Sequence, residues 1–273
     1  MPDWEAAKAE MNQLWDRRNF GEGEAAFAEI EANLKTMSVG GRFCNYCEHN
    51  LISSRSIEHI RPKSTFPAYA FRWENMLKVC PQCNMESKIA KMWIFCPEGS
   101  NTLEPTTRRQ PPTEDICFIN PRIEDAMELM ELDFLSFQFF CNRNFAVGSR
   151  EFLKVEKTIE ILNLGSDDLA AQREAAFLDF KNCLAIYCQA MAAQDIQDLR
   201  LALGGYPDVH EAQDFLTKKS QILAHLKASF FHKMHQTVWR EMQRRYTELS
   251  LEVQLLFEKS GASQWLPTPN HPL

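Results

Sequence analysis

The sequence has no long apolar run and no basic-then-apolar start. Its longest uninterrupted apolar stretch is Cys183–Cys188, six residues, far short of the roughly 18 needed to span a bilayer. The first five residues, MPDWE, do not have the order of a signal peptide. We therefore expect a soluble, cytoplasmic protein.

Nine cysteines in 273 residues are too few for a small disulfide scaffold. Nine is also an odd number, so the cysteines cannot all be paired in disulfides. Four of them form two CxxC pairs, Cys44/Cys47 and Cys80/Cys83. In a reducing compartment such pairs indicate metal rather than disulfides. The other five lie among apolar neighbours and are expected to be small buried hydrophobes: Cys96, Cys117, Cys141, Cys183 and Cys188.

The chain also lacks an overall positive charge, since its net charge is −7, which excludes binding of nucleic acid by the whole surface. The charge is unevenly distributed, however. Residues 41–110 hold ten Lys/Arg against six Asp/Glu, a net of +4, and the remainder carries −11. A basic segment inside an acidic chain predicts a local surface that faces phosphates, although charge also varies along a chain by chance.

Apolar spacing predicts an α+β protein that is mainly helical, with one small zinc-clamped module. We expect an N-terminal helical segment over 1–40, a zinc-bound module over 41–110 and a helical C-terminal region over 111–273. Two features are expected in the last region: a strand pair within 130–148, with a turn at 142–144, and a helix that ends at 163–165. That acidic region is a candidate surface for partner docking or oligomerisation.

The two CxxC pairs predict a structural zinc site. Each pair can offer two thiolates to one Zn²⁺, and two pairs complete a tetrahedral site with four sulfur ligands. The 32 residues between Cys47 and Cys80 leave room for a hairpin and a loop. Because the cysteines fill all four positions, this zinc should clamp the module and take no part in chemistry.

Between the two pairs lie residues suited to phosphodiester hydrolysis. His59 can act as a base, because imidazole titrates near neutral pH. Glu58 and Asn84 offer oxygen ligands of the kind that Mg²⁺ or Mn²⁺ prefers. Neighbouring residues on a strand point to opposite faces, so Glu58 and His59 can serve one site only if the backbone bends or one acts through water.

The order CxxC, acidic-His, Asn, CxxC-Asn-x3-Lys resembles the zinc-bound HNH endonucleases, which carry a ββα-metal site. The resemblance implies that His59 is the general base and that Glu58 and Asn84 are the two ligands of the catalytic metal. Asn75 corresponds to the residue that holds the intervening loop by hydrogen bonds, and Lys88 to one that faces a phosphate. Glu58 is a departure, since Asp or His is more frequent there.

A wider likeness covers about residues 40–180 and runs through 57–63, 73–75, 119–125 and 158–164. There the chain is similar to the PtuB-like HNH nucleases of Septu-type and retron-linked anti-phage systems. The resemblance implies a nuclease effector, with DNA as the expected substrate and RNA as the alternative. It also implies an ABC/RecF-like (PtuA-like) ATPase as the partner.

Three points stay open at this level. Arg61 and Lys63 can contact phosphates, but solvated surface cations are an equal alternative. The chain could be a homo-oligomer. Finally, the zinc module could be catalytically silent and bind nucleic acid or a partner protein, although a binding module has no need for a base and metal ligands together at these positions.

Overall fold

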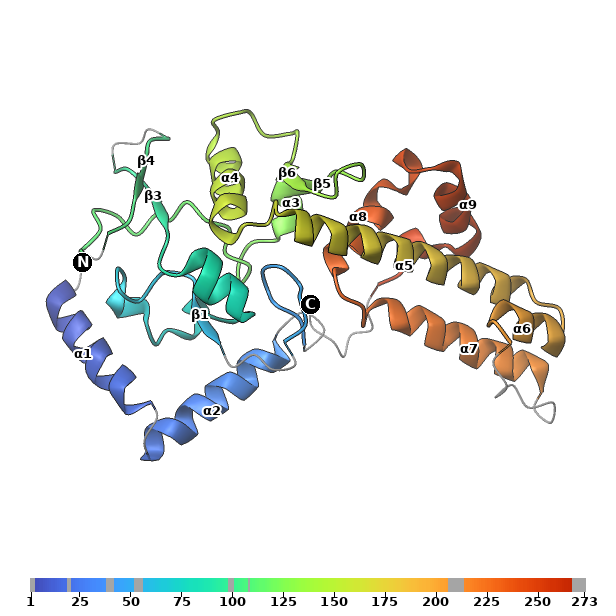
Figure 1. Cartoon of the computed structure of the whole chain (residues 1–273), viewed down its shortest axis with the longest axis horizontal. Coiled ribbons are helices and arrows are strands. Elements are labelled where there is room, and N and C mark those ends of the chain that lie inside the picture. The colour runs from blue at the N-terminus through green and yellow to red at the C-terminus, as the bar shows by residue number, and fades with distance from the viewer. Residues whose placement is uncertain are drawn as a thin grey trace. The chain divides into compact units, whose positions relative to one another are not determined.

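The computed structural model describes residues 3–18, 21–37, 42–51, 56–97, 101–107, 109–205 and 214–266. It is a mainly helical α+β structure with small two-stranded sheets (Figure 1). The chain divides into two compact units, Met1–Ala170 and Ala171–Pro272. The expected boundary at 110/111 falls inside the first unit. Among the described helices, none has the length and apolar character to cross a membrane.

Two N-terminal helices open the first unit, α1 (Trp4–Arg17) and α2 (Gly21–Thr36). Asp3 caps α1 by accepting from the backbone N–H groups of the first turn. Trp4 Nε1 donates to Thr65 O at 2.8 Å, which fixes α1 against the segment after β1. In α2, Glu31 pairs with the buried Lys78 of β2 at 2.6 Å. Both helices therefore pack on the cysteine-containing module.

The module itself is a hairpin followed by short elements. β1 (Ile57–His59) pairs antiparallel with β2 (Met76–Lys78), with Glu58 opposite Leu77 and His59 opposite Met76. Two single-turn helices lie between these strands, η1 (Pro67–Tyr69) and η2 (Trp73–Asn75). After β2 come the π-type helix η3 (Gln82–Lys88) and a second hairpin of β3 (Trp93–Phe95) and β4 (Leu103–Pro105).

The rest of the first unit is a third hairpin and a helix. It contains α3 (Ala126–Leu129), β5 (Met130–Leu132), β6 (Phe139–Cys141) and α4 (Arg150–Leu162). The hairpin lies within 130–148, but its turn is at 133–138 and not at 142–144. Asp133 makes this turn, because its carboxylate accepts from the N–H groups of Leu135 and Ser136.

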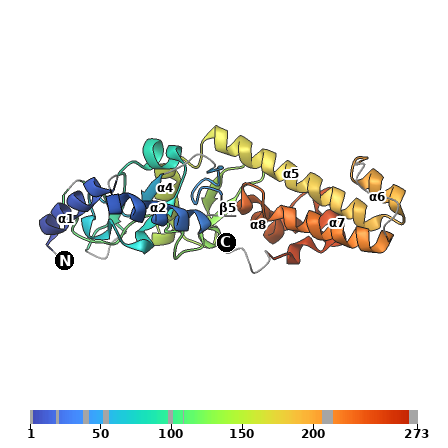
Figure 2. The ribbon, with the colours of Figure 1, turned by 90° about the horizontal axis from the view of Figure 1, so that it is seen from below.

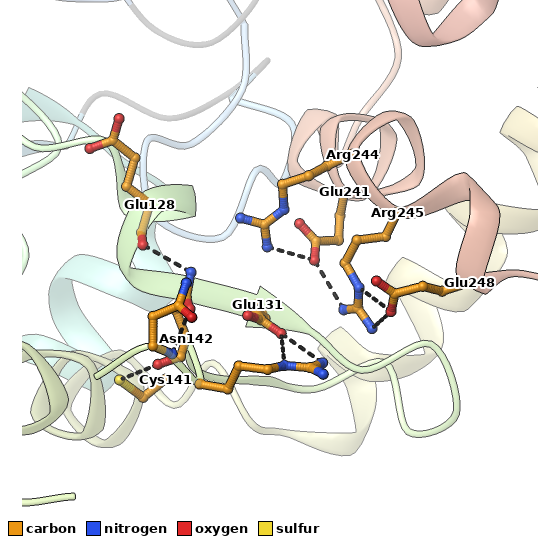
Figure 3. A network of polar contacts seen from close by, with 10 residues as sticks. Glu128, Glu131, Cys141, Asn142, Glu241, Arg244, Arg245 and Glu248 are labelled. Atoms are coloured by element: carbon orange, nitrogen blue, oxygen red, sulfur yellow. Dashed lines mark hydrogen bonds and ion pairs between the residues drawn. The ribbon is translucent and has the colours of Figure 1, made fainter. Parts of the chain in front are cut away.

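Two hydrogen bonds from Asn142 hold the end of this hairpin. Asn142 Nδ2 donates to Glu128 O at 3.3 Å, and Asn142 N donates to Leu129 O at 2.8 Å (Figure 3). The 142–144 segment is thus a β6-to-α4 connection tied back to α3. The helix α4 then ends where the sequence predicts, with Asn163 in the left-handed conformation at φ 52°.

The second unit is all helical in its described part. It holds most of α5 (Asp167–Ala192), with α6 (Ile196–Ala202), α7 (Phe215–Phe230), α8 (Gln236–Arg245) and α9 (Leu251–Ser260). Two single-turn helices follow α8 and α9, η4 (Tyr246–Glu248) and η5 (Ala262–Gln264). The helices α5 and α7 run side by side (Figure 2). The apolar stripe from about Val209 to Phe231 predicts one helix, and its first residues lie outside the described part of the chain.

Aromatic side chains form the core of the second unit. Trp239 is 1% exposed, and its ring centroid lies 4.6 Å from that of Phe230 and 5.3 Å from that of Phe180. One carboxylate is also buried, that of Glu241 in α8. It pairs with Arg244 and Arg245 of the same helix, at 2.8 and 3.1 Å (Figure 3). The large aromatic residues of these helices therefore pack against one another in the core of the second unit.

Candidate metal centre and the polar site beside it

The four paired cysteines come together as the sequence predicts. Their sulfur atoms all lie within 4.8 Å of one another, and Cys47 Sγ is 3.6 Å from Cys80 Sγ. All four side chains are buried. Thiolates that share a tetrahedral zinc at Zn–S distances of about 2.3 Å stand about 3.8 Å apart. The cluster therefore fits a structural Zn²⁺, and because it has four sulfur donors it offers no open position for chemistry.

Local backbone structure builds each half of this cluster. In the first half, Glu48 N donates to Cys44 O at 2.9 Å and Glu48 takes a positive φ of 60°, so the chain turns back after Cys47. In the second half, Cys80 N donates to Cys44 Sγ at 3.4 Å and Cys83 N to Cys80 Sγ at 3.5 Å. Such N–H···S contacts stabilise the thiolate form that zinc requires.

The cluster is part of the main core of the first unit. The cysteines pack with Ile60, Leu77, Phe118 and, from α4 and the segment after it, Ile161 and Leu164. A metal here would therefore join the 44–47 turn to the start of η3, within a core to which α4 also contributes. It would also close the loop that contains the β1–β2 hairpin.

Glu58 and Lys88 form a buried ion pair beside the hairpin. Lys88 is 0% exposed and Glu58 2%. The Lys88 ammonium contacts Glu58 Oε1 and donates to His59 O at 2.8 Å. Burial raises the pKa of Glu58, and the Lys88 charge opposes this rise. The expectation that Lys88 faces a phosphate is therefore not met, because its charge is engaged inside the protein.

His59 points to the other side of β1. Its Nε2 lies 2.8 Å from Ala70 O, and its ring centroid lies 5.4 Å from that of Trp15. Burial, followed by the nearby Lys63 charge, lowers the pKa of His59 to about 4, so the ring is neutral near pH 7. A carbonyl oxygen only accepts hydrogen bonds, so Nε2 carries the proton and Nδ1 keeps the lone pair.

Asn75 ties together the loop between the two strands. It is 1% exposed. Its Oδ1 accepts from Arg61 N at 2.7 Å, and its Nδ2 donates to Arg61 O at 3.1 Å and to Tyr69 O at 3.0 Å. These three bonds hold the residues that follow His59 next to η1.

Asn84 lies close to β1. Its Nδ2 donates to Ile57 O at 3.3 Å, and the residue is half-buried. It stands near the start of η3, where Ile89 N donates to Asn84 O at 3.0 Å, the five-residue spacing of a π-helix. Since the Nδ2 group is engaged, the amide oxygen is the atom that could serve a cation.

The structure thus brings part of the predicted site together. Glu58, Asn84 and Lys88 lie on the η3 side of the hairpin, whereas His59 faces α1 and η1. The strand β1 keeps regular pairing across Glu58 and His59, so its two side chains go to opposite faces.

The two basic residues that the sequence suggests as phosphate contacts, Arg61 and Lys63, differ in their surroundings. Arg61 is half-buried, with its guanidinium 4.8 Å from the Tyr69 ring centroid and Nη2 donating to Glu114 O at 3.3 Å. Lys63 lies against Trp15, with Nζ 4.2 Å from the ring centroid. Trp15 itself was missed as a site residue, because its spacing in α1 marks it only as part of an apolar stripe.

No protein-family model, curated protein or solved structure matches this chain.

Proposed function

We propose that the chain is a metal-dependent HNH-type endonuclease that hydrolyses phosphodiester bonds of DNA. The hydrogen bond between His59 Nε2 and Ala70 O is the observation that carries this proposal. A neutral imidazole with its Nε2 proton fixed on a backbone carbonyl has Nδ1 available to take a proton from water. The hairpin, the following η3 and the four-cysteine clamp supply the small rigid frame that such a base requires.

In the proposed reaction, His59 removes a proton from a water molecule. Because His59 and Glu58 lie on opposite faces of β1, the base would act on a phosphate on the Glu58 side only through this water. The water oxygen attacks phosphorus, and the bond from phosphorus to the leaving oxygen breaks. Asn75 affects this step indirectly, because its three hydrogen bonds hold the loop that follows His59. It is therefore a positioning residue.

The oxygens of Glu58 and Asn84 would hold a Mg²⁺ or Mn²⁺ ion. One carboxylate and one amide oxygen, completed by water and phosphate oxygens, match the usual donors of these ions. When bound, such an ion neutralises negative charge on the phosphate and on the leaving oxygen. Because Lys88 contacts Glu58 Oε1, such an ion would have to share the carboxylate with the Lys88 ammonium or displace it.

The buried Glu58–Lys88 pair favours a second candidate function. A carboxylate already paired with a buried ammonium can be purely structural. In that case the module is a catalytically silent zinc domain that binds nucleic acid or a partner protein. The two candidates differ in whether the purified protein cleaves DNA.

We expect the purified protein to cleave plasmid DNA with Mg²⁺ or Mn²⁺ and not with EDTA. Replacing His59 by alanine should lower the rate by about 10²–10⁴-fold, the usual contribution of a general base. Agarose-gel analysis of plasmid conversion measures this. Zinc content and the melting temperature of each sample show whether EDTA or the substitution has disturbed the cysteine cluster.

Wild-type cleavage rates in His59→Ala would contradict the base assignment. If neither protein cuts under any of these conditions, the experiment is repeated in the presence of an ABC/RecF-like ATPase partner. Absence of cutting there as well would favour the silent module.

The proposed biological setting is anti-phage defence, with an ABC/RecF-like ATPase that restrains or delivers the nuclease. Two segments of the wider likeness, 119–125 and 158–164, support this proposal because they contact each other: Ile119 N donates to Thr158 Oγ1 at 2.9 Å. They belong to the same unit as the cysteine cluster. Co-purification of such an ATPase with the whole chain, and its loss on removal of residues 171–273, which leaves the first unit whole, would be the expected result.

A further inference from the structure

Two cations lie against one indole ring next to His59. The Arg18 guanidinium is 4.8 Å from the ring centroid of Trp15, and Lys63 Nζ is 4.2 Å from the same centroid. Arg18 comes from the end of α1 and Lys63 from the segment after β1. Two sequence-distant positive charges are therefore held on one side chain, which itself contacts the His59 ring.

This arrangement is built into the packing of α1. Arg18 Nη1 donates to Trp15 O at 2.7 Å, which fixes the guanidinium beside the indole. Phe27 of α2 packs on Trp15 with ring centroids 5.6 Å apart. At its other end, α1 is tied to Thr65 by Trp4. The packing of α1 and Trp15 therefore helps to set the position of Arg18 relative to Lys63, together with the side-chain rotamers of the two cations.

Arg18 and Lys63 have no direct ion-pair partner within the described part of the chain. The Glu58 carboxylate favours the charged form of Lys63, but it is itself paired with Lys88. All three members of the group, Arg18, Trp15 and Lys63, are half-buried. Burial and the Arg18 charge both lower the pKa of Lys63. Two like charges held together in partial burial form a site for an anion.

We propose that Arg18 and Lys63, held by Trp15, form a clamp that binds a phosphate of the DNA backbone beside His59. This inference depends on the proposed function for its substrate. It makes α1, which lies outside the zinc-clamped segment, part of the substrate-binding surface. Trp15 positions both cations and contacts the His59 ring.

Binding of a short fluorescein-labelled DNA duplex, measured by anisotropy without added divalent metal, tests the clamp. The zinc-loaded full chain is titrated at several salt concentrations. Replacing both Arg18 and Lys63 by glutamine should weaken binding by about tenfold or more. It should also reduce the slope of log K against log salt by about 0.9, the value for one lost phosphate contact.

Two variants serve as controls. Arg17 is exposed on the same turn of α1 and has no contact with Trp15 among those described, so Arg17→Gln should leave affinity and slope nearly unchanged. Exchanging the two cations, Arg18→Lys with Lys63→Arg, should retain most of the slope, because both charges remain. Melting temperatures confirm that each variant is folded.

DNA binding tests the clamp and DNA cleavage tests the nuclease, so the two proposals can fail independently. A wild-type protein that binds DNA through this pair but cleaves it neither alone nor with the ATPase partner would refute the nuclease and leave the clamp standing. A wild-type protein that cleaves DNA, with a double glutamine variant that binds and cleaves equally well, would overturn the clamp. Failure of the wild-type protein to bind the duplex would overturn it as well.

Discussion

Serine in place of Cys80 is expected to release zinc and to destabilise the first unit strongly. Four sulfurs within 4.8 Å of one another fit one Zn²⁺, and an alcohol is a much weaker zinc ligand than a thiolate. Zinc binding and folding are coupled, because an unfolded chain does not hold the four ligands together. A loss of roughly 5 kcal/mol corresponds to a fall of about 10–20 °C in the melting temperature.

The measurement pairs metal content with thermal unfolding. Zinc is quantified by mass spectrometry in the wild-type protein and in Cys80→Ser, and melting is followed by circular dichroism. Cys96→Ser is the matched control, since Cys96 lies in the same unit but outside the cluster. One equivalent of zinc in the wild-type protein and in the control, with less in Cys80→Ser, is the expected result. Full zinc and an unchanged melting temperature in Cys80→Ser would contradict the four-cysteine site.

The cysteine cluster was predictable because its signal is local and specific. Two CxxC pairs restrict the number of ways in which four thiolates can meet, and the buried cluster confirms the prediction. The helix end at Asn163 was predictable for a similar reason, since an Asn-Leu-Gly run suits a left-handed cap. The turn between β5 and β6 was misplaced because Asn142-Arg143-Asn144 resembles a turn in composition, whereas Asp133 supplies the hydrogen bonds.

Contacts between distant segments were not predictable. Helical spacing correctly puts Lys88 on the same face of η3 as Asn84, but only the fold shows that β1 covers this face. A lysine in a basic segment is normally solvated, and its burial here depends on Glu58, thirty residues earlier in the chain. Trp15 reaches the His59 ring only because α1 docks on η1, a contact that no local pattern encodes.

Methionine in place of Lys88 is expected to destabilise the first unit by about 3–5 kcal/mol. This is the usual effect of removing one partner of a buried ion pair, because the Glu58 carboxylate then stays buried without its ammonium. Combining Lys88→Met with Glu58→Gln should recover much of that loss, since neither side chain is then charged. Lys91→Met is the control, because Lys91 is exposed, and its effect should stay within about 0.5 kcal/mol. Urea unfolding curves give these free energies.

The same variant tests whether Glu58 can bind a divalent cation. Without Lys88, the carboxylate is free of its competitor, so Mn²⁺ or Mg²⁺ should bind Glu58 and Asn84 more tightly and raise the stability of Lys88→Met. A cation at 100 times its dissociation constant adds about 2.7 kcal/mol to the free energy of unfolding. The double variant, which lacks the carboxylate, should gain much less. If Lys88→Met does not respond to either cation, Glu58 is a structural partner of Lys88, and a metal ligand must be sought elsewhere. A selective gain in Lys88→Met would instead identify the ion pair as the contact that a catalytic metal must share or displace.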